Sequence, residues 1–69
     1  MKMHLKINGR NEEFEAETLS ITGVLREMNY TLPELIIKFK GEIIPEVDFD
    51  KVFLVDNDEI LIIHVFAGG

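Results

Sequence analysis

The sequence predicts one small α+β domain in which a single helix packs across one face of a mixed β-sheet, in the order ββαβββ. Three observations lead to this fold class. The chain has 69 residues, 46% of them apolar, which suits one globular domain. Short segments of alternating apolar and polar residues indicate strands, and one segment has helical spacing. A lone helix has no large apolar surface other than the sheet to pack on.

The first two strands are predicted to form a hairpin over residues 2–17, because apolar and polar residues alternate on both sides of a polar break. Two registers are compatible with the pattern. A turn at Asn8-Gly9 would place Met3 opposite Phe14, whereas a turn one residue later would place Leu5 opposite Phe14. We favour the second register, because it opposes apolar residues on one face and pairs lysines with glutamates on the other.

The helix is predicted to begin after Ser20, whose hydroxyl can accept a hydrogen bond from a free backbone N–H of the first turn. Apolar residues then follow at positions i, i+3, i+4 and i+7, which form one face of a helix: Ile21, Val24, Leu25 and Met28. Asn29 suits a left-handed terminating position, and Pro33 opposes continuation. The segment therefore predicts one short amphipathic helix that packing must stabilise.

The third and fourth strands are predicted on either side of Gly41. Residues 35–40 are rich in β-branched and aromatic residues, and residues 42–44 follow the tight bend that glycine permits. The stretch 46–54 has no clear period. We interpret it as a loop or a single helical turn, with Phe49 plugging the core.

The last strand is predicted over residues 59–67, after a turn signal at residues 56–58. Ile60 and Ile62 would face the helix, and the residues that alternate with them would point to the opposite face of the sheet. We expect an exposed apolar surface there that binds a partner, formed by Ile36, Leu61, Ile63 and Val65. The alternative is that a loop or a second copy of the chain covers this face.

The predicted elements fit the β-grasp arrangement of ubiquitin if the last strand is central and parallel to the first. The pattern alone does not fix that strand order. We expect residues 1–67 to form a single β-grasp domain and residues 68–69 to form a flexible C-terminal Gly-Gly tail.

The composition argues against a nucleic-acid or membrane partner. Thirteen acidic residues against seven basic ones give a net charge of −6, which opposes binding to phosphates. A basic protein partner is the electrostatic expectation, and the alternative is that the acidity only keeps a small protein soluble. No apolar run approaches the roughly 18 residues of a membrane span, and the N-terminus does not open as a signal peptide. We therefore expect a soluble, cytoplasmic protein.

No catalytic or metal-binding motif is recognisable. His4 and His64 lie on predicted strands without the spacing of a metal site, and no nucleophile–base pair or nucleotide-binding motif is present. The chain has no cysteine, so no side chain can hold sulfur as a persulfide or thioester. The absence of cysteine also fits a reducing compartment. We expect no bound metal or cofactor and no enzymatic activity of the chain itself.

The C-terminal pair Gly68-Gly69 is the candidate functional site. A terminal carboxylate on a stalk without side chains can enter the active site of another protein, where a bulky side chain would block the passage. The alternative is an incidental, frayed end.

Several segments together resemble the ThiS family, the sulfur carrier proteins of thiamin biosynthesis within the ubiquitin-like β-grasp proteins. The resemblance spans nearly the whole chain and lies in Ser20-Ile21, Val24-Leu25, residues 40–45, residues 56–62 and residues 65–69. The chain departs from the family at Lys40, Glu46, Phe49 and Asn57, where the family usually has Asn, a basic residue, Trp and Gly. These departures concern turns and the partner surface more than the tail.

The resemblance implies that an E1-like adenylyltransferase activates the Gly69 carboxylate with ATP. Sulfur from a cysteine-desulfurase-type source would then replace one oxygen and give a thiocarboxylate, from which thiazole synthase would take the sulfur. Phe66, Ala67 and Gly68 would be threaded into the partner ahead of the reactive end.

Other functions remain open at this point. The chain could donate sulfur for molybdopterin or tRNA thiolation, act as a ubiquitin-like protein modifier, or be a binding module that carries no sulfur. The molybdopterin small subunits tend to have prolines before the terminal glycines, and residues 64–67 contain none. This difference favours a role in thiamin biosynthesis over one in molybdopterin biosynthesis.

Overall fold

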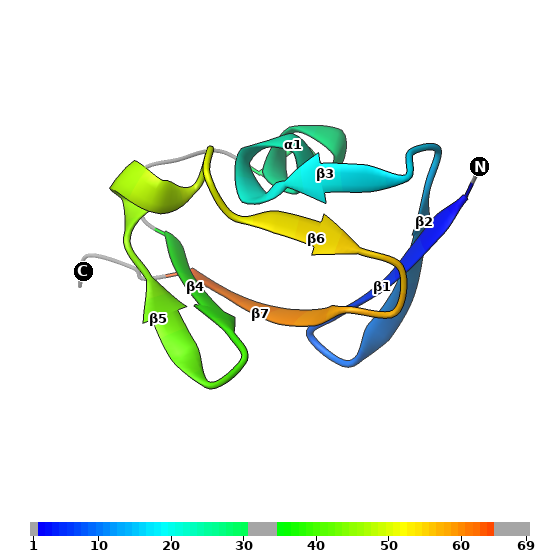
Figure 1. Ribbon diagram of the computed structural model, residues 1–69. Coiled ribbons are helices and arrows are strands. Elements are labelled where there is room, and N and C mark those ends of the chain that lie inside the picture. Colours follow the sequence, from blue (N-terminus) through cyan, green and yellow to red (C-terminus); the bar gives the residue numbers. More distant parts are fainter. Residues whose placement is uncertain (1, 31–34, 65–69) are drawn as a thin grey trace.

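Figure 1 shows a computed structural model that describes residues 2–30 and 35–64. A five-stranded sheet forms one layer, and the helix lies across one face of it together with a smaller, two-stranded sheet. The elements are β1 (Met3–Ile7), β2 (Arg10–Phe14), β3 (Thr18–Ser20), α1 (Ile21–Glu27), β4 (Leu35–Phe39), β5 (Glu42–Ile44), the 3₁₀ turn η1 (Glu46–Asp48), β6 (Phe53–Val55) and β7 (Glu59–His64). None of the helices in these two ranges is long and apolar enough to cross a membrane.

The large sheet has the strand order β2-β1-β7-β4-β5. The last strand, β7, is central, and it runs parallel to β1 and antiparallel to β4. Taken along the chain, the strands of this sheet and α1 follow the order ββαβββ, so the predicted fold class is confirmed. The second sheet, which pairs β3 with β6, was not predicted.

The favoured register of the first hairpin is wrong. β1 and β2 pair with Met3 opposite Phe14 and Leu5 opposite Glu12, which is the register of a turn at Asn8-Gly9. Both turn residues have positive φ, 54° and 83°, and this backbone is the one that an Asn-Gly pair adopts most easily. A turn at Gly9-Arg10 would offer only one residue that readily adopts positive φ, so it would be confined to type II′ geometry. The hairpin also ends at Phe14, before the expected limit of residue 17.

The helix begins and ends at the expected residues. The Ser20 Oγ accepts a hydrogen bond from the backbone N–H of Gly23 at 3.0 Å, and Asn29 follows the helix with a φ of 60°. Because α1 has only seven residues, it is too short to be stable alone. Its buried residues, Ile21, Val24 and Leu25, provide that stability by packing onto the sheet.

The core lies between α1, the two-stranded sheet and one face of the large sheet. Its buried residues are Met3, Leu5, Ile7, Phe14, Ile21, Val24, Leu25, Ile37, Phe49, Leu54, Ile60 and Ile62. Phe49 is 3% exposed directly after η1, which confirms the interpretation of a helical turn carrying a plug. The segment after it was interpreted as loop, but residues 53–55 form β6 and bury Leu54 completely.

Candidate functional site

The proposed reactive end and the residues before it lie outside the described part of the chain. These residues are Val65, Phe66, Ala67, Gly68 and Gly69, and the expected domain boundary after residue 67 falls among them. What the structure does describe is the strand from which this segment follows, β7, up to His64.

One edge of β7 is paired with β4 from Ile60 to His64. Partner residues run from Phe39 opposite Ile60 to Leu35 opposite His64. The other edge meets β1 only at its beginning, where Ile7 lies beside Ile60. The strand that leads to the proposed reactive end is therefore held on both sides at its start and chiefly on one side toward its end.

The side chain of Asn8 contacts the less supported edge. The Asn8 Nδ2 group donates to the Ile62 carbonyl at 3.1 Å, and the Ile62 N–H donates to the Asn8 Oδ1 atom at 2.7 Å. Reasoning from the sequence assigned Asn8 only to a turn. The signal for a turn was present in the Asn-Gly pair, but nothing in the pattern indicated a contact with a residue 54 positions away.

The face of the sheet that points away from α1 carries a group of apolar side chains. Ile63 lies directly opposite Ile36, and Lys38 lies opposite both Leu61 and Ile43. Opposed residues of an antiparallel pair project to the same face. We call Ile36, Ile43, Leu61 and Ile63 the outer patch.

Exposure differs sharply between the two faces of β7. Leu61 and Ile63 are 41% and 45% exposed, whereas Ile60 and Ile62 are 1% and 5% exposed. Ile43, which sequence reasoning did not single out, is 66% exposed, and Ile36 is half-buried. The structure thus brings together three of the four residues expected at a partner surface, and the fourth, Val65, lies outside the described residues.

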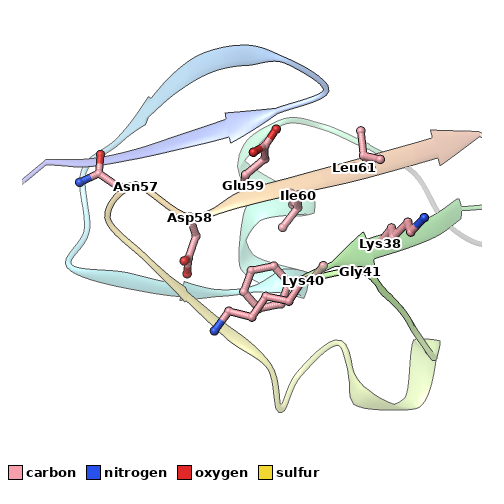
Figure 2. Close-up of a pocket in the computed structure, with 9 residues that line it drawn as sticks. Lys38, Lys40, Gly41, Asn57, Asp58, Glu59, Ile60 and Leu61 are labelled. Atoms are coloured by element: carbon pink, nitrogen blue, oxygen red, sulfur yellow. The ribbon is translucent and has the colours of Figure 1, made fainter.

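A hollow of about 430 Å³ adjoins the outer patch. Figure 2 shows that its lining comes from the end of β4, the bend before β5, the turn before β7 and the start of β7. The lining mixes lysines, Lys38 and Lys40, with carboxylates, Asp58 and Glu59. Charges of both signs beside the apolar side chains Ile60 and Leu61 are typical of the rim of a contact surface.

An exposed pair of residues fixes the turn before β7 to β1. The backbone N–H of His4 donates to Asp56 Oδ1 at 2.7 Å, and the His4 ring nitrogen Nδ1 lies 3.3 Å from the same oxygen. The backbone hydrogen bond from His4 is the main reason why the pKa of Asp56 lies below its usual value of 3.8. The Asn57 N–H donates back to the His4 carbonyl at 2.7 Å. The pair therefore acts as a structural clamp.

The two histidines do not lie in a metal site within the described ranges. No group of three or more His, Cys, Asp or Glu side chains in residues 2–30 and 35–64 has the arrangement that holds a metal ion. The His64 ring contacts the Tyr30 ring, with centroids 5.2 Å apart.

Comparison with known proteins adds to this picture. The model of the ThiS family matches residues 5–69. The crystal structure of a thiamine biosynthesis protein (ThiS) from Geobacter metallireducens superimposes with a TM-score of 0.84 at 25% identity, covering 97% of this chain and 100% of that one. A solution structure of a thiamine biosynthesis protein from the same organism gives a TM-score of 0.79 at 26% identity, covering 97% and 88%. No curated protein sequence gives a significant match.

Proposed function

Because the chain belongs to the ThiS family of sulfur carrier proteins, we propose that it carries sulfur as a thiocarboxylate on Gly69. The observation that supports this most strongly is the extent of the family match, which runs through the two terminal glycines to residue 69. The composition is consistent with it, because a chain without cysteine has no thiol on which to hold sulfur.

The proposed chemistry is performed on the chain by other proteins. An E1-like adenylyltransferase would join the Gly69 carboxylate to AMP from ATP and release pyrophosphate. The carboxylate is a poor electrophile until one of its oxygens becomes part of a good leaving group. A persulfide from a cysteine-desulfurase-type source would then displace AMP and form an acyl disulfide. A thiol reductant would cleave the S–S bond of this intermediate, leave the thiocarboxylate on Gly69 and itself end in a disulfide. In the cytoplasm, thiazole synthase would take the sulfur for the thiazole of thiamin.

The outer patch is the surface that we assign to these partners. Leu61 and Ile63 project from β7 itself, so a protein that covers them lies beside the strand that leads to Gly69. Exposed apolar groups of this kind mark interaction surfaces in small proteins. The net charge of −6 favours partners whose contact surfaces are basic.

Intact mass measurement tests the proposal. The chain is incubated with ATP, a sulfur source and an E1-like enzyme that is shown to activate another member of the family. We expect a mass gain equal to the exchange of one oxygen for sulfur, and we expect it to disappear when Gly69 is deleted. The deletion should leave the melting temperature nearly unchanged, because glycine has no side chain to bury.

Two other results would contradict the proposal and indicate a different function. A ladder of products linked through isopeptide bonds would identify a protein modifier. An unchanged mass in the presence of the competent enzyme would favour a binding module without carrier chemistry.

A further inference from the structure

The Asn8 side chain takes the place of a neighbouring strand beside β7. β1 pairs with β7 at Lys6 and Ile7, and the backbone N–H of Asn8 makes the next hydrogen bond, to the Ile60 carbonyl at 3.1 Å. The chain then turns away through Gly9 into β2. From this point the edge of β7 that faces β1 is met by the Asn8 amide instead of by backbone.

The two hydrogen bonds of this amide reproduce the pattern of a β-ladder. A primary amide offers a donor and an acceptor side by side, as the N–H and C=O of a hydrogen-bonded residue in an adjacent antiparallel strand do. Nδ2 donates to the Ile62 carbonyl and Oδ1 accepts from the Ile62 N–H. Both bonds are partly buried, so water replaces them poorly. They extend the support of β7 two residues beyond the last backbone bond from this side.

The turn itself does not require these bonds. A φ of 54° at Asn8 is accessible to glycine without steric cost, so a side chain with this exact pair of contacts is an additional feature. Its partner, Ile62, lies two residues before the end of β7 and seven residues before Gly69. The amide therefore acts close to the place where the candidate reactive segment starts.

We infer that Asn8 is a positioning residue for presentation of the C-terminal segment: by bonding both polar groups of Ile62, it fixes the end of β7 from which that segment starts. This inference rests on the proposed function. Because the end of β7 is already ordered, less conformational entropy is lost when a partner binds the C-terminal segment. The benefit therefore belongs to binding and not to the chemical step.

Three variants separate positioning from a merely structural role. Asn8→Gly keeps the positive φ and removes both hydrogen bonds. Asn8→Asp keeps an acceptor for the Ile62 N–H but loses the donor and brings a carboxylate to the Ile62 carbonyl. Thr18→Val is the matched control, because it removes a single partly buried bond from a side chain to a distant backbone group, the Leu54 carbonyl at 2.8 Å, in the other sheet.

The first measurement is amide hydrogen exchange followed by NMR. We expect the Ile62 amide to exchange about five- to thirtyfold faster in Asn8→Gly, since each net hydrogen bond is worth about a factor of five. In Thr18→Val the exchange of this amide should change only as much as that of the core amides. An unchanged Ile62 amide in Asn8→Gly would show that the bonds do not hold β7.

The second measurement is the steady-state kinetics of adenylation with the E1-like enzyme, in which the chain is the varied substrate. We expect the KM of Asn8→Gly to rise about three- to tenfold with kcat within twofold of wild type, as for a loss of uniform binding. The KM of Asn8→Asp should rise by the same factor as the KM of Asn8→Gly or by a smaller one. Thr18→Val should keep the wild-type KM although its melting temperature falls.

The outcomes also distinguish the inference from the proposed function. Wild-type KM values in both Asn8 variants, or an equal rise in Thr18→Val, would overturn the positioning role while adenylation of the wild-type chain stands. A wild-type chain that is not adenylated would overturn the proposed function and the positioning role together.

Discussion

Replacing Ile63 by alanine should weaken docking on the activating enzyme while the chain stays folded. The Ile63 side chain is 45% exposed in the outer patch. Full burial of an isoleucine is worth about 1.5–3 kcal/mol, so the part that a partner can still cover is worth about 0.7–1.4 kcal/mol. That free energy corresponds to a roughly three- to tenfold increase in Kd.

The cost to the fold follows from the other part of the same side chain. The buried share of Ile63 is worth about 0.8–1.6 kcal/mol on the same scale. In a domain of this size each kcal/mol shifts Tm by about 4–8 °C, so Ile63→Ala should melt roughly 3–13 °C below wild type. This loss is smaller than the roughly 3–5 kcal/mol that a core of this size supplies, and the variant remains folded at room temperature.

Binding calorimetry and thermal melts followed by circular dichroism provide the assay, with Val55→Ala as the matched control. Val55 is 52% exposed on β6, outside the outer patch, so its truncation should lower Tm similarly and leave Kd within twofold. The reasoning is refuted if Val55→Ala weakens docking as much as Ile63→Ala does. It is equally refuted if Ile63→Ala binds with the wild-type Kd.

Three further predictions concern the scaffold. Leu54→Ala removes a fully buried side chain at a cost of about 2–5 kcal/mol. It should therefore lower Tm by at least about 8 °C, and a melt within 5 °C of wild type (about 1 kcal/mol) would contradict this. Gly9→Ala should lower Tm by about 4–8 °C. Gly9 has a φ of +83° and open space around an added Cβ, so left-handed strain of about 1 kcal/mol is the only penalty. An unchanged Tm would show that the turn relaxes to a conformation that alanine tolerates. Asp56 has a pKa below 3.8 in the folded chain because the His4 N–H donates to it. The contribution of its carboxylate to the stability of the folded state is therefore present above about pH 4 and is lost as the pH falls through the folded pKa. The Tm difference between wild type and Asp56→Asn should therefore be full at neutral pH and vanish in strong acid, and a difference independent of pH would argue against the linkage.

The large sheet and the helix could be predicted because their residues carry clear periods. Each of β1, β4 and β7 has at least five residues with one face in the core, which is long enough for alternation to be recognised. β3 and β6 have three residues each. Their strand character comes from pairing with each other across 33 or more positions, as between Ser20 and Phe53, and no local pattern reports such a pairing.

The hairpin register was wrong because facing apolar residues were given more weight than turn geometry. Leu5 is 1% exposed although Glu12, which is half-buried, lies opposite it. The core on the face toward α1 covers Leu5, so it does not need an apolar partner on β2. The left-handed preference of Asn8-Gly9 is local and decides the register.

Two departures from the family pattern fall at left-handed positions. Lys40 has a φ of 53° and Asn57 a φ of 72°, and the family resemblance predicts Asn and Gly there. Both of those residue types tolerate positive φ better than lysine does. The resemblance thus identified the positions, and the backbone supplies the physical reason why these residue types suit them.

The central place of β7 joins the scaffold to the site. Its inner residues, Ile60 and Ile62, anchor the core, and its outer residues, Leu61 and Ile63, form half of the outer patch. A partner that binds the segment after His64 therefore acts on a strand with hydrogen bonds to β4 on one side and to β1 and Asn8 on the other. An edge strand would offer the same sequence of side chains with hydrogen bonds on one side only. Because opening β7 would break both sets of bonds and expose the core, capture of the terminal segment can proceed while the fold stays closed.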